Sequence, residues 1–167
     1  TVGGAIGKDN NNTETTDIVY QAKTLIKELA TNDWGVGLVV GNVRHPQINT
    51  ESNVIGNLYA YVPASFSFLD DRFVLHTNLG ALHSKDEKNT YITWGLGSET
   101  RLTNRSYFIG EVFGQNKGNP FFQLGIRYWL VPNHVQFDTT YGNRMNNTSE
   151  EQWFSIGLRL LSKPILP

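Results

Sequence analysis

Apolar residues alternate with polar or small residues along most of this chain. In residues 121–130 every even-numbered position is apolar or aromatic, whereas the odd-numbered positions include Gln123, Gly125 and Arg127. In residues 152–161 the same alternation sets the even-numbered positions from Phe154 onward apart from Ser155, Gly157 and Arg159. Successive side chains of a β-strand point to opposite faces of the sheet. The period of two therefore predicts β-strands.

The alternation extends over nine segments and predicts a strand in each: 16–29, 33–43, 54–68, 71–83, 90–102, 105–114, 120–130, 134–142 and 152–161. These lengths suit strands that cross a membrane at a tilt, which takes roughly 9–11 residues. Residues 1–7 resemble the end of a further strand. We therefore expect a single domain over residues 1–167, which forms the C-terminal part of a longer polypeptide.

Residues 16–29 carry two competing patterns. Ile18, Ala22, Leu25, Ile26 and Leu29 recur at spacings of three and four, which is also typical of an amphipathic helix. Alternate positions from Ile18 to Ile26 fit a strand as well, and the tripeptide 31–33 resembles a tight turn into the next segment. We predict a strand here and keep the helix as the alternative.

The breaks between segments are alternately short and long. Short breaks fall near 31–33, 70–71, 104–105 and 132–134. Long polar breaks fall near 8–15, 44–53, 84–89, 115–119 and 143–151. Short turns at one end and long loops at the other are typical of barrels in the bacterial outer membrane.

Composition limits the alternatives. The chain has 167 residues, a net charge of −1 and no cysteine. A near-neutral charge supplies no basic field for nucleic acid, and the lack of cysteine excludes disulfides and thiolate chemistry. No run of about 18 apolar residues is present, so hydropathy predicts no transmembrane helix. No two of the four histidines stand at a metal-ligand spacing, and we expect neither a metal nor another cofactor.

Four late stretches resemble the C-terminal half of Gram-negative outer-membrane barrels: Gly110–Gly114, Phe122–Tyr128, Pro132–Asp138 and Trp153–Arg159. The group that they resemble most comprises the MetA-pathway phenol-degradation proteins and related uncharacterised outer-membrane proteins. The resemblance implies an all-β, antiparallel, up-and-down transmembrane β-barrel with about ten visible strands. It also implies a location in the bacterial outer membrane and contact with membrane lipid. The function that it implies is either passive passage of small molecules, including apolar or aromatic ones, or a structural role in that membrane.

The strand pattern sorts the candidate site residues into two groups. The polar face is expected to line a lumen and carries Glu99, Arg101, Glu111, Gln123, Arg127, Asp138 and Arg159. The apolar face is expected to meet lipid and carries Leu124, Ile126, Phe137, Ile156 and Leu158. His76 and Asn78 are expected to point inward as ordinary hydrogen-bonded residues.

A charge network follows from the strand order. Arg127 and Asp138 are expected to be neighbours across the turn at 131–133, and Arg159 on the next strand would reach the same carboxylate. An enclosed charge is tolerated only when it is paired or wet. Such a network would either plug a narrow lumen or line an aqueous pore and bias its selectivity.

Two other classes of function remain as alternatives. A soluble β-barrel that binds an apolar ligand would alternate in the same way, but its apolar face would form the core. An outer-membrane lipid hydrolase needs a nucleophile and a base within reach of each other. Ser98 and Glu99 are neighbours in a strand and point to opposite faces, and the chain has no Gly-x-Ser-x-Gly motif. We therefore expect no catalytic residues and no enzyme activity. The sequence leaves the oligomeric state open.

Overall fold

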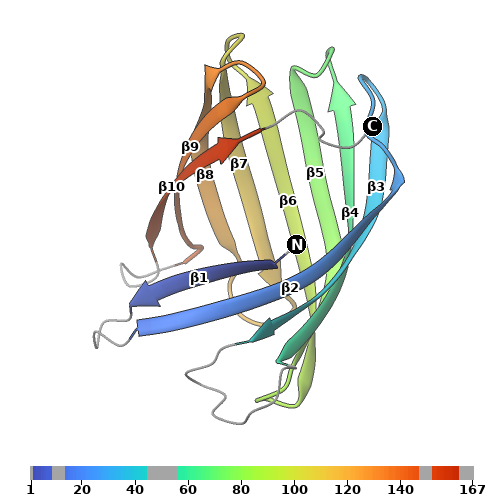
Figure 1. The fold of residues 1–167 in the computed structure, drawn as a ribbon. Helices are drawn as coiled ribbons and strands as arrows, with labels where there is room; N and C mark the ends of the chain where they lie inside the picture. The colour runs from blue at the N-terminus through green and yellow to red at the C-terminus, as the bar shows by residue number, and fades with distance from the viewer. Residues whose placement is uncertain (1, 9–13, 45–55, 147–151, 162–167) are drawn as a thin grey trace.

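The computed structural model describes residues 2–8, 14–44, 56–146 and 152–161, with side chains described from Ile18 onward. The described chain is all β (Figure 1). Its strands are β1 (Val2–Lys8), β2 (Glu14–Lys27), β3 (Trp34–Arg44), β4 (Asn57–Phe68), β5 (Phe73–Ser84), β6 (Asn89–Arg101), β7 (Ser106–Gln115), β8 (Phe121–Val131), β9 (Val135–Arg144) and β10 (Trp153–Leu160).

The strands form one antiparallel up-and-down sheet, in which each strand pairs with its neighbours in sequence. The prediction of an all-β antiparallel sheet is confirmed, and each predicted strand lies within about three residues of an observed one. Residues 16–29 are the strand β2 and not a helix. Pairing with both β1 and β3 provides its backbone hydrogen bonds, and a register shift between Leu25 and Lys27 precedes its end.

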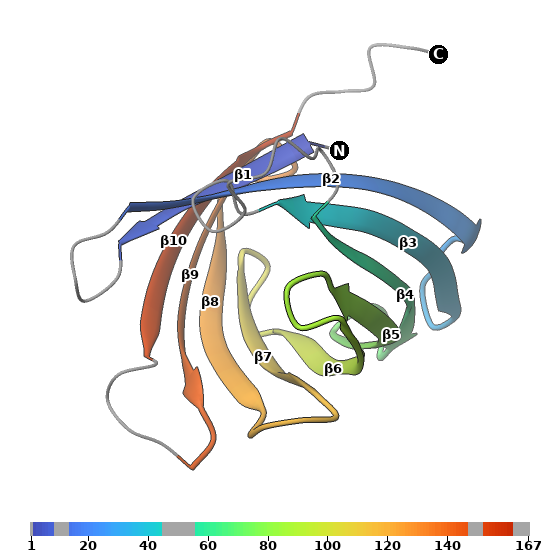
Figure 2. The ribbon, with the colours of Figure 1, turned by 90° about the horizontal axis from the view of Figure 1, so that it is seen from below.

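The sheet curves strongly and has two different faces. Phe113 on β7 and Trp153 on β10 have ring centroids only 6.3 Å apart. Three steps between flat neighbouring strands would separate them by roughly 14 Å. The sheet therefore curls toward the face that carries both rings, which we call the concave face; the opposite one is the convex face. Figure 2 shows the sheet bending through most of a ring.

The two edges of the sheet are β1 and β10. They lie on the same side of the ring in Figure 2, but no backbone pairing joins them among the residues described. Closure into a barrel is therefore a proposal and not an observation.

The connections differ in length between the two ends of the sheet. At one end they span residues 28–33, 69–72, 102–105 and 132–134. At the other end they span residues 9–13, 45–56, 85–88, 116–120 and 145–152. We call these the short-turn end and the loop end. The difference rests mainly on 45–56 and 145–152, because 85–88 is only as long as 69–72 and 102–105 at the short-turn end.

Two large rings on the concave face lie over glycines of the neighbouring strands. The Tyr59 ring on β4 covers Gly41 on β3, where an added Cβ would lie 2.3 Å from Tyr59 Cζ. The Trp153 ring covers Gly142 on β9 in the same way, at 2.2 Å from Cζ2. These glycines are needed because any side chain there would displace the ring. Among the described residues, the buried apolar side chains are only Val39 and Tyr91.

Candidate functional site

The seven polar residues that the sequence places on one face lie together on the concave face of β6–β10. Directly opposed residues of antiparallel strands share a face. Gly97 opposes Glu111, and Glu111 opposes Gln123. Arg127 opposes Asp138, and the same register extends to Arg159 on β10. That these residues line a lumen stays a prediction.

Two side-chain interactions organise the middle of this face. Arg127 Nη1 on β8 donates a hydrogen bond to Glu99 Oε2 on β6, and the resulting ion pair spans β7. Gln123 Nε2 donates to Glu111 Oε2 at 2.6 Å. The side chains of Arg127 and Glu99 are 22% and 24% exposed. At this exposure their attraction is only partly screened, so we expect the pair to be stronger than a surface ion pair.

A cavity of about 390 Å³ opens beside the Arg127–Glu99 pair. Its lining includes His76, Glu99, Glu111 and Arg127. His76 Nδ1 lies 2.8 Å from Ser65 Oγ on β4. The cavity therefore combines two carboxylates, a guanidinium and an imidazole, which together offer hydrogen-bond donors and acceptors to a polar solute. The sequence predicted that His76 points inward, but only the register shows that it shares a cavity with the two glutamates.

The predicted sharing of Asp138 by two arginines is not what the structure shows. Arg127 bonds to Glu99 instead, and the described residues include no salt bridge of Asp138. The Asp138 carboxylate leans into the space left by Gly157 on β10, where an added Cβ would lie 2.6 Å from Oδ2. A short aspartate fits that space, whereas the long arginine extends across β7 in the other direction.

Arg101 and Arg159 lie apart from the central pair. The Arg101 guanidinium carbon stands 5.8 Å from the centre of the Tyr107 ring, near the short-turn end. Arg159 is exposed on the edge strand β10, opposite Gln136. The structure thus joins four of the seven predicted residues in two pairs.

The convex face carries the apolar residues that the sequence assigned to lipid. Leu124 and Ile126 are 47% and 42% exposed, and Ile156 and Leu158 are 67% and 63% exposed. Phe137 lies on the same face and is half-buried. Large apolar side chains are exposed on nearly every strand of this face. Examples are Leu38, Leu58, Leu79 and Leu96. Contact with lipid stays a prediction.

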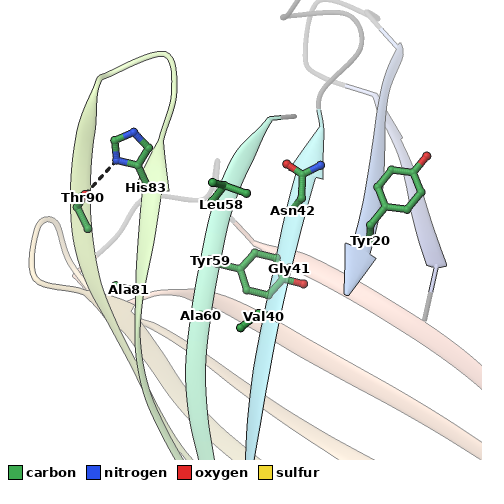
Figure 3. Close-up of a pocket in the computed structure, with 10 residues that line it drawn as sticks. All are labelled: Tyr20, Val40, Gly41, Asn42, Leu58, Tyr59, Ala60, Ala81, His83 and Thr90. Atoms are coloured by element: carbon green, nitrogen blue, oxygen red, sulfur yellow. Dashed lines mark hydrogen bonds between the residues drawn. The ribbon is translucent and has the colours of Figure 1, made fainter. Parts of the chain in front are cut away.

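A shallow hollow of about 550 Å³ lies on the convex side of β2–β6, toward the loop end (Figure 3). Small residues such as Ala60 and Ala81 leave the space, and Tyr20 and Leu58 border it. His83 Nδ1 lies 3.0 Å from Thr90 Oγ1 at its rim. The hollow and the charged cavity beside Arg127 therefore lie on opposite faces of the sheet.

Side-chain hydrogen bonds join two connections at the short-turn end, 28–33 and 69–72, into what we call the turn clasp. Asn32 Nδ2 donates to Asp70 Oδ1 at 2.7 Å, and Asp70 N donates to Asn32 Oδ1 at 2.8 Å. Thr31 Oγ1 donates to Asp71 Oδ2 at 2.6 Å, and Ser67 Oγ donates to Asp71 Oδ1.

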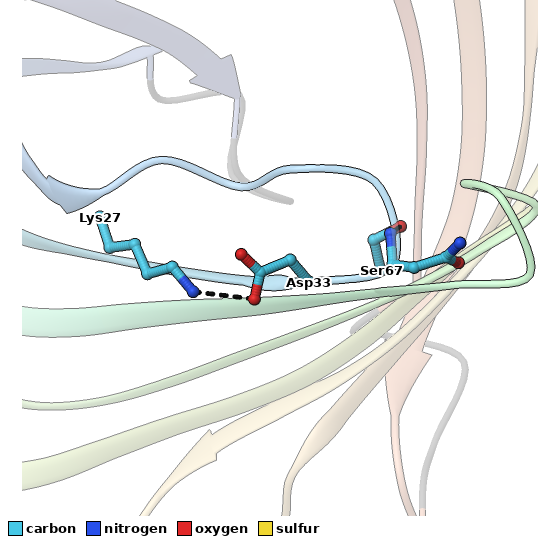
Figure 4. A network of polar contacts seen from close by, with 4 residues as sticks. Lys27, Asp33 and Ser67 are labelled. Carbon is cyan, nitrogen blue, oxygen red and sulfur yellow. Dashed lines mark hydrogen bonds and ion pairs between the residues drawn. The ribbon is translucent and has the colours of Figure 1, made fainter.

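An ion pair adds to the turn clasp. Lys27 Nζ contacts Asp33 Oδ1 at 2.8 Å (Figure 4) and lies 4.1 Å from the centre of the Trp34 ring. Sequence patterns did not reveal the turn clasp, because its two halves lie almost forty residues apart.

The turn clasp predicts a specific acid sensitivity. Hydrogen bonds from Ser67 and Thr31 lower the pKa of Asp71 below its ordinary value of 3.8. The bond from Lys27 lowers the pKa of Asp33. A carboxyl whose pKa is lowered by folding stabilises the folded state while it is charged. This contribution is lost as the pH falls below the pKa of the unfolded chain and through the lower pKa of the folded state.

We therefore expect Asp71→Asn to lower the free energy of unfolding at pH 7. The wild type should lose stability between about pH 4 and pH 2, and we expect this loss to be smaller in the variant. Urea titration of the detergent-solubilised protein at each pH measures this. Asp86→Asn, at the loop end, is the control and should follow the wild type. An Asp71→Asn curve parallel to the wild type at all pH values would contradict the assignment.

The described residues contain no group of three or more histidine, aspartate or glutamate side chains that could hold a metal ion. His45 lies outside them. Likewise, none of the described segments forms a helix of the length and apolar character that crossing a membrane requires.

Comparison with known families adds one result. The sequence profile of the family described as Uncharacterised conserved protein UCP029691 matches residues 5–161. The chain belongs to this family. Neither the comparison with curated proteins nor that with solved structures found a match. The residues that match the UCP029691 profile include those of both the convex and the concave face. The description of the family gives no activity. The finer resemblance to phenol-degradation outer-membrane proteins stays a prediction.

Proposed function

We propose that this chain is a β-barrel of the bacterial outer membrane through whose interior small molecules pass. The observation that carries the proposal is the reversed distribution of polarity. The convex face exposes large apolar side chains, whereas the concave face holds the Arg127–Glu99 pair and the Gln123–Glu111 pair. Contact with lipid removes the cost of exposing the convex face to water, and a wet interior solvates the charges.

The alternative, a soluble barrel with an apolar ligand inside, requires the opposite arrangement. Leu124, Ile126, Ile156 and Leu158 would then form the core, and Arg127 would face bulk water. The exposed fractions of these four residues favour the membrane barrel. The small number of buried apolar side chains also favours the membrane barrel, because among the described residues these are only Val39 and Tyr91. A soluble domain of this length would bury a much larger apolar core.

Closure of the barrel is part of the proposal. An open sheet edge exposes unpaired backbone groups, which is costly in hydrocarbon, so a sheet crosses a bilayer as a closed barrel. The described residues form ten alternating strands, so the first and the last run in opposite directions, and β1 and β10 therefore suit antiparallel pairing. An even number of strands is typical of bacterial outer-membrane barrels.

The experiment that tests passage is conductance across a planar lipid bilayer. We expect the refolded full chain to produce discrete conductance steps, because a charged concave face keeps water in the lumen. Heat-dependent migration on gels shows first that the protein is folded, and denatured protein at the same concentration is the control. Folded protein that leaves the conductance at the level of the denatured control would contradict passage.

A further inference from the structure

Three rows of side chains on the convex face explain the hollow shown in Figure 3. Directly opposed residues of antiparallel strands lie side by side on one face, so each row crosses the strands. The row nearest the loop end consists of Tyr20, Asn42, Leu58, His83 and Thr90. The middle row consists of Ala22, Val40, Ala60, Ala81 and Ile92. The third row contains Thr24, Leu38, Val62, Leu79 and Trp94.

The middle row is the floor of the hollow, and the outer rows are its walls. Ala60 and Ala81 are short, whereas Leu58 on one side and Leu79 on the other are 48% and 63% exposed. The lining residues belong to strands from β2 to β6, which are four interstrand steps apart. The hollow therefore extends across the strands for roughly 19 Å. An extended acyl chain, which crosses half of the hydrocarbon core, needs about 15 Å.

The chemistry of the lining suits hydrocarbon. The described residues that line the hollow include no lysine, arginine, aspartate or glutamate. The polar side chains at its rim already have partners: His83 Nδ1 lies 3.0 Å from Thr90 Oγ1, and Asn42 Oδ1 accepts a hydrogen bond from Gly56 N at 2.7 Å. The floor of alanine and valine offers only van der Waals contacts, so an apolar ligand fits it better than a polar one.

The shape of the hollow favours a thin and flexible occupant. Its two walls are four residues apart along each strand, which separates their backbones by roughly 13 Å, and the wall side chains narrow this space. A helix, with a diameter of about 10–12 Å, is too wide to reach the floor. A second copy would present its own convex face. Two convex faces touch along a narrow strip, whereas a stable protein interface buries about 800 Å² on each partner.

We propose that this hollow binds one acyl chain of a membrane lipid. The chain lies over Ala60 and Ala81, between the wall rows. It restores the van der Waals contacts that an unfilled space above the floor would lose. The inference rests on the proposed membrane location of the convex face and deepens it, because it assigns one lipid chain to a fixed place on that face.

Native mass spectrometry of the folded full chain, released from detergent with added dimyristoyl phosphatidylethanolamine, tests the inference. We expect saturable retention of one lipid molecule. Dihexanoyl phosphatidylethanolamine has the same headgroup but short chains, and it should bind at least about tenfold more weakly. Equal binding of the two lipids would mean that the headgroup is recognised, and it would overturn the proposal.

A matched pair of variants locates the site. Ala60→Leu raises the floor and should weaken retention of the long-chain lipid about tenfold, because the added side chain takes the place of about two methylene groups. The Ala60 side chain is exposed, so folding should tolerate the change. Ala64→Leu is the control. It makes the same substitution four residues along β4, on the same face but outside the hollow, and should bind lipid as the wild type does.

Heat-dependent gel migration verifies the fold of each variant, and Ala81→Leu replaces Ala60→Leu should the latter fail to fold. Retention by the floor variant equal to that of Ala64→Leu, or no retention by the wild type, would overturn the proposal. So would a dimer that Ala60→Leu dissociates, because a second copy would then occupy the hollow. Conductance without lipid retention contradicts this inference alone, whereas lipid retention without conductance contradicts passage alone.

Discussion

Replacing Leu124 with arginine is expected to lower the stability of the protein in a lipid bilayer by about 2–4 kcal/mol. Leu124 lies near the middle of β8 on the convex face, where nearly half of its side chain is exposed. If that face meets lipid, the substitution places a charge in hydrocarbon without a partner. Urea-dependent folding into lipid vesicles, followed by tryptophan fluorescence and gel migration, measures the loss.

The neighbouring position provides a matched control. Gln123 precedes Leu124 on the same strand but points to the concave face and bonds to Glu111. Gln123→Arg introduces the same charge one residue away, beside a carboxylate. It should fold into vesicles as well as the wild type. An equal loss of stability for both variants would contradict the assignment of the two faces.

Replacing Arg127 with methionine is expected to cost about 2 kcal/mol of unfolding free energy. The substitution keeps much of the side-chain volume but leaves the Glu99 carboxylate without its cation. Breaking a fully buried pair costs roughly 3–5 kcal/mol, and breaking an exposed one costs up to about 1 kcal/mol. Since both side chains are about three-quarters covered, an intermediate value follows. Urea unfolding in detergent measures it.

A double-mutant cycle separates the pair from other effects of the substitution. Arg127→Met combined with Glu99→Gln removes both charges and should be more stable than Arg127→Met alone, because no unpaired carboxylate remains. Arg159→Met is the control: the same change on the same face at an exposed edge position should alter stability by less than about 0.5 kcal/mol. Strict additivity of the two substitutions would contradict the ion pair.

The strands and the division into two faces could be predicted from the sequence, because both depend on the period of two. The helix alternative for 16–29 was excluded only by the pairing of β2 with both neighbours. The apolar spacing of that segment is compatible with either structure, so long-range hydrogen bonding decided the outcome.

Contacts between distant strands could not be predicted. Strand order correctly places Arg127 opposite Asp138, but the length of the arginine side chain and the empty space at Gly157 direct the charge to Glu99 instead. The turn clasp and the contact between the Phe113 and Trp153 rings likewise join segments far apart in the sequence. Alternation of residue types carries no information about such contacts. The sequence therefore predicts which face a residue occupies better than which partner it contacts.

The concave face carries a second cavity besides the charged one. It has a volume of about 310 Å³, lies at the loop end, and is lined in part by Phe113 and Phe121. If β1 and β10 pair, the concave face encloses both this pocket and the charged cavity beside Arg127. A solute that enters from the loop end would then meet the pocket first and the charged cavity farther along the lumen. The order of these two sites along the strands is fixed by the register of β7 and β8.

The most direct test measures what surrounds adjacent side chains in the bilayer. The natural chain has no cysteine, so single cysteines at Ser155 and Ile156 on β10 can be labelled without background. With an environment-sensitive fluorophore in lipid vesicles, we predict that the label at 156 is quenched by nitroxide-labelled lipid and the label at 155 by aqueous iodide. The reverse pattern, with 155 in lipid and 156 in water, would contradict the account.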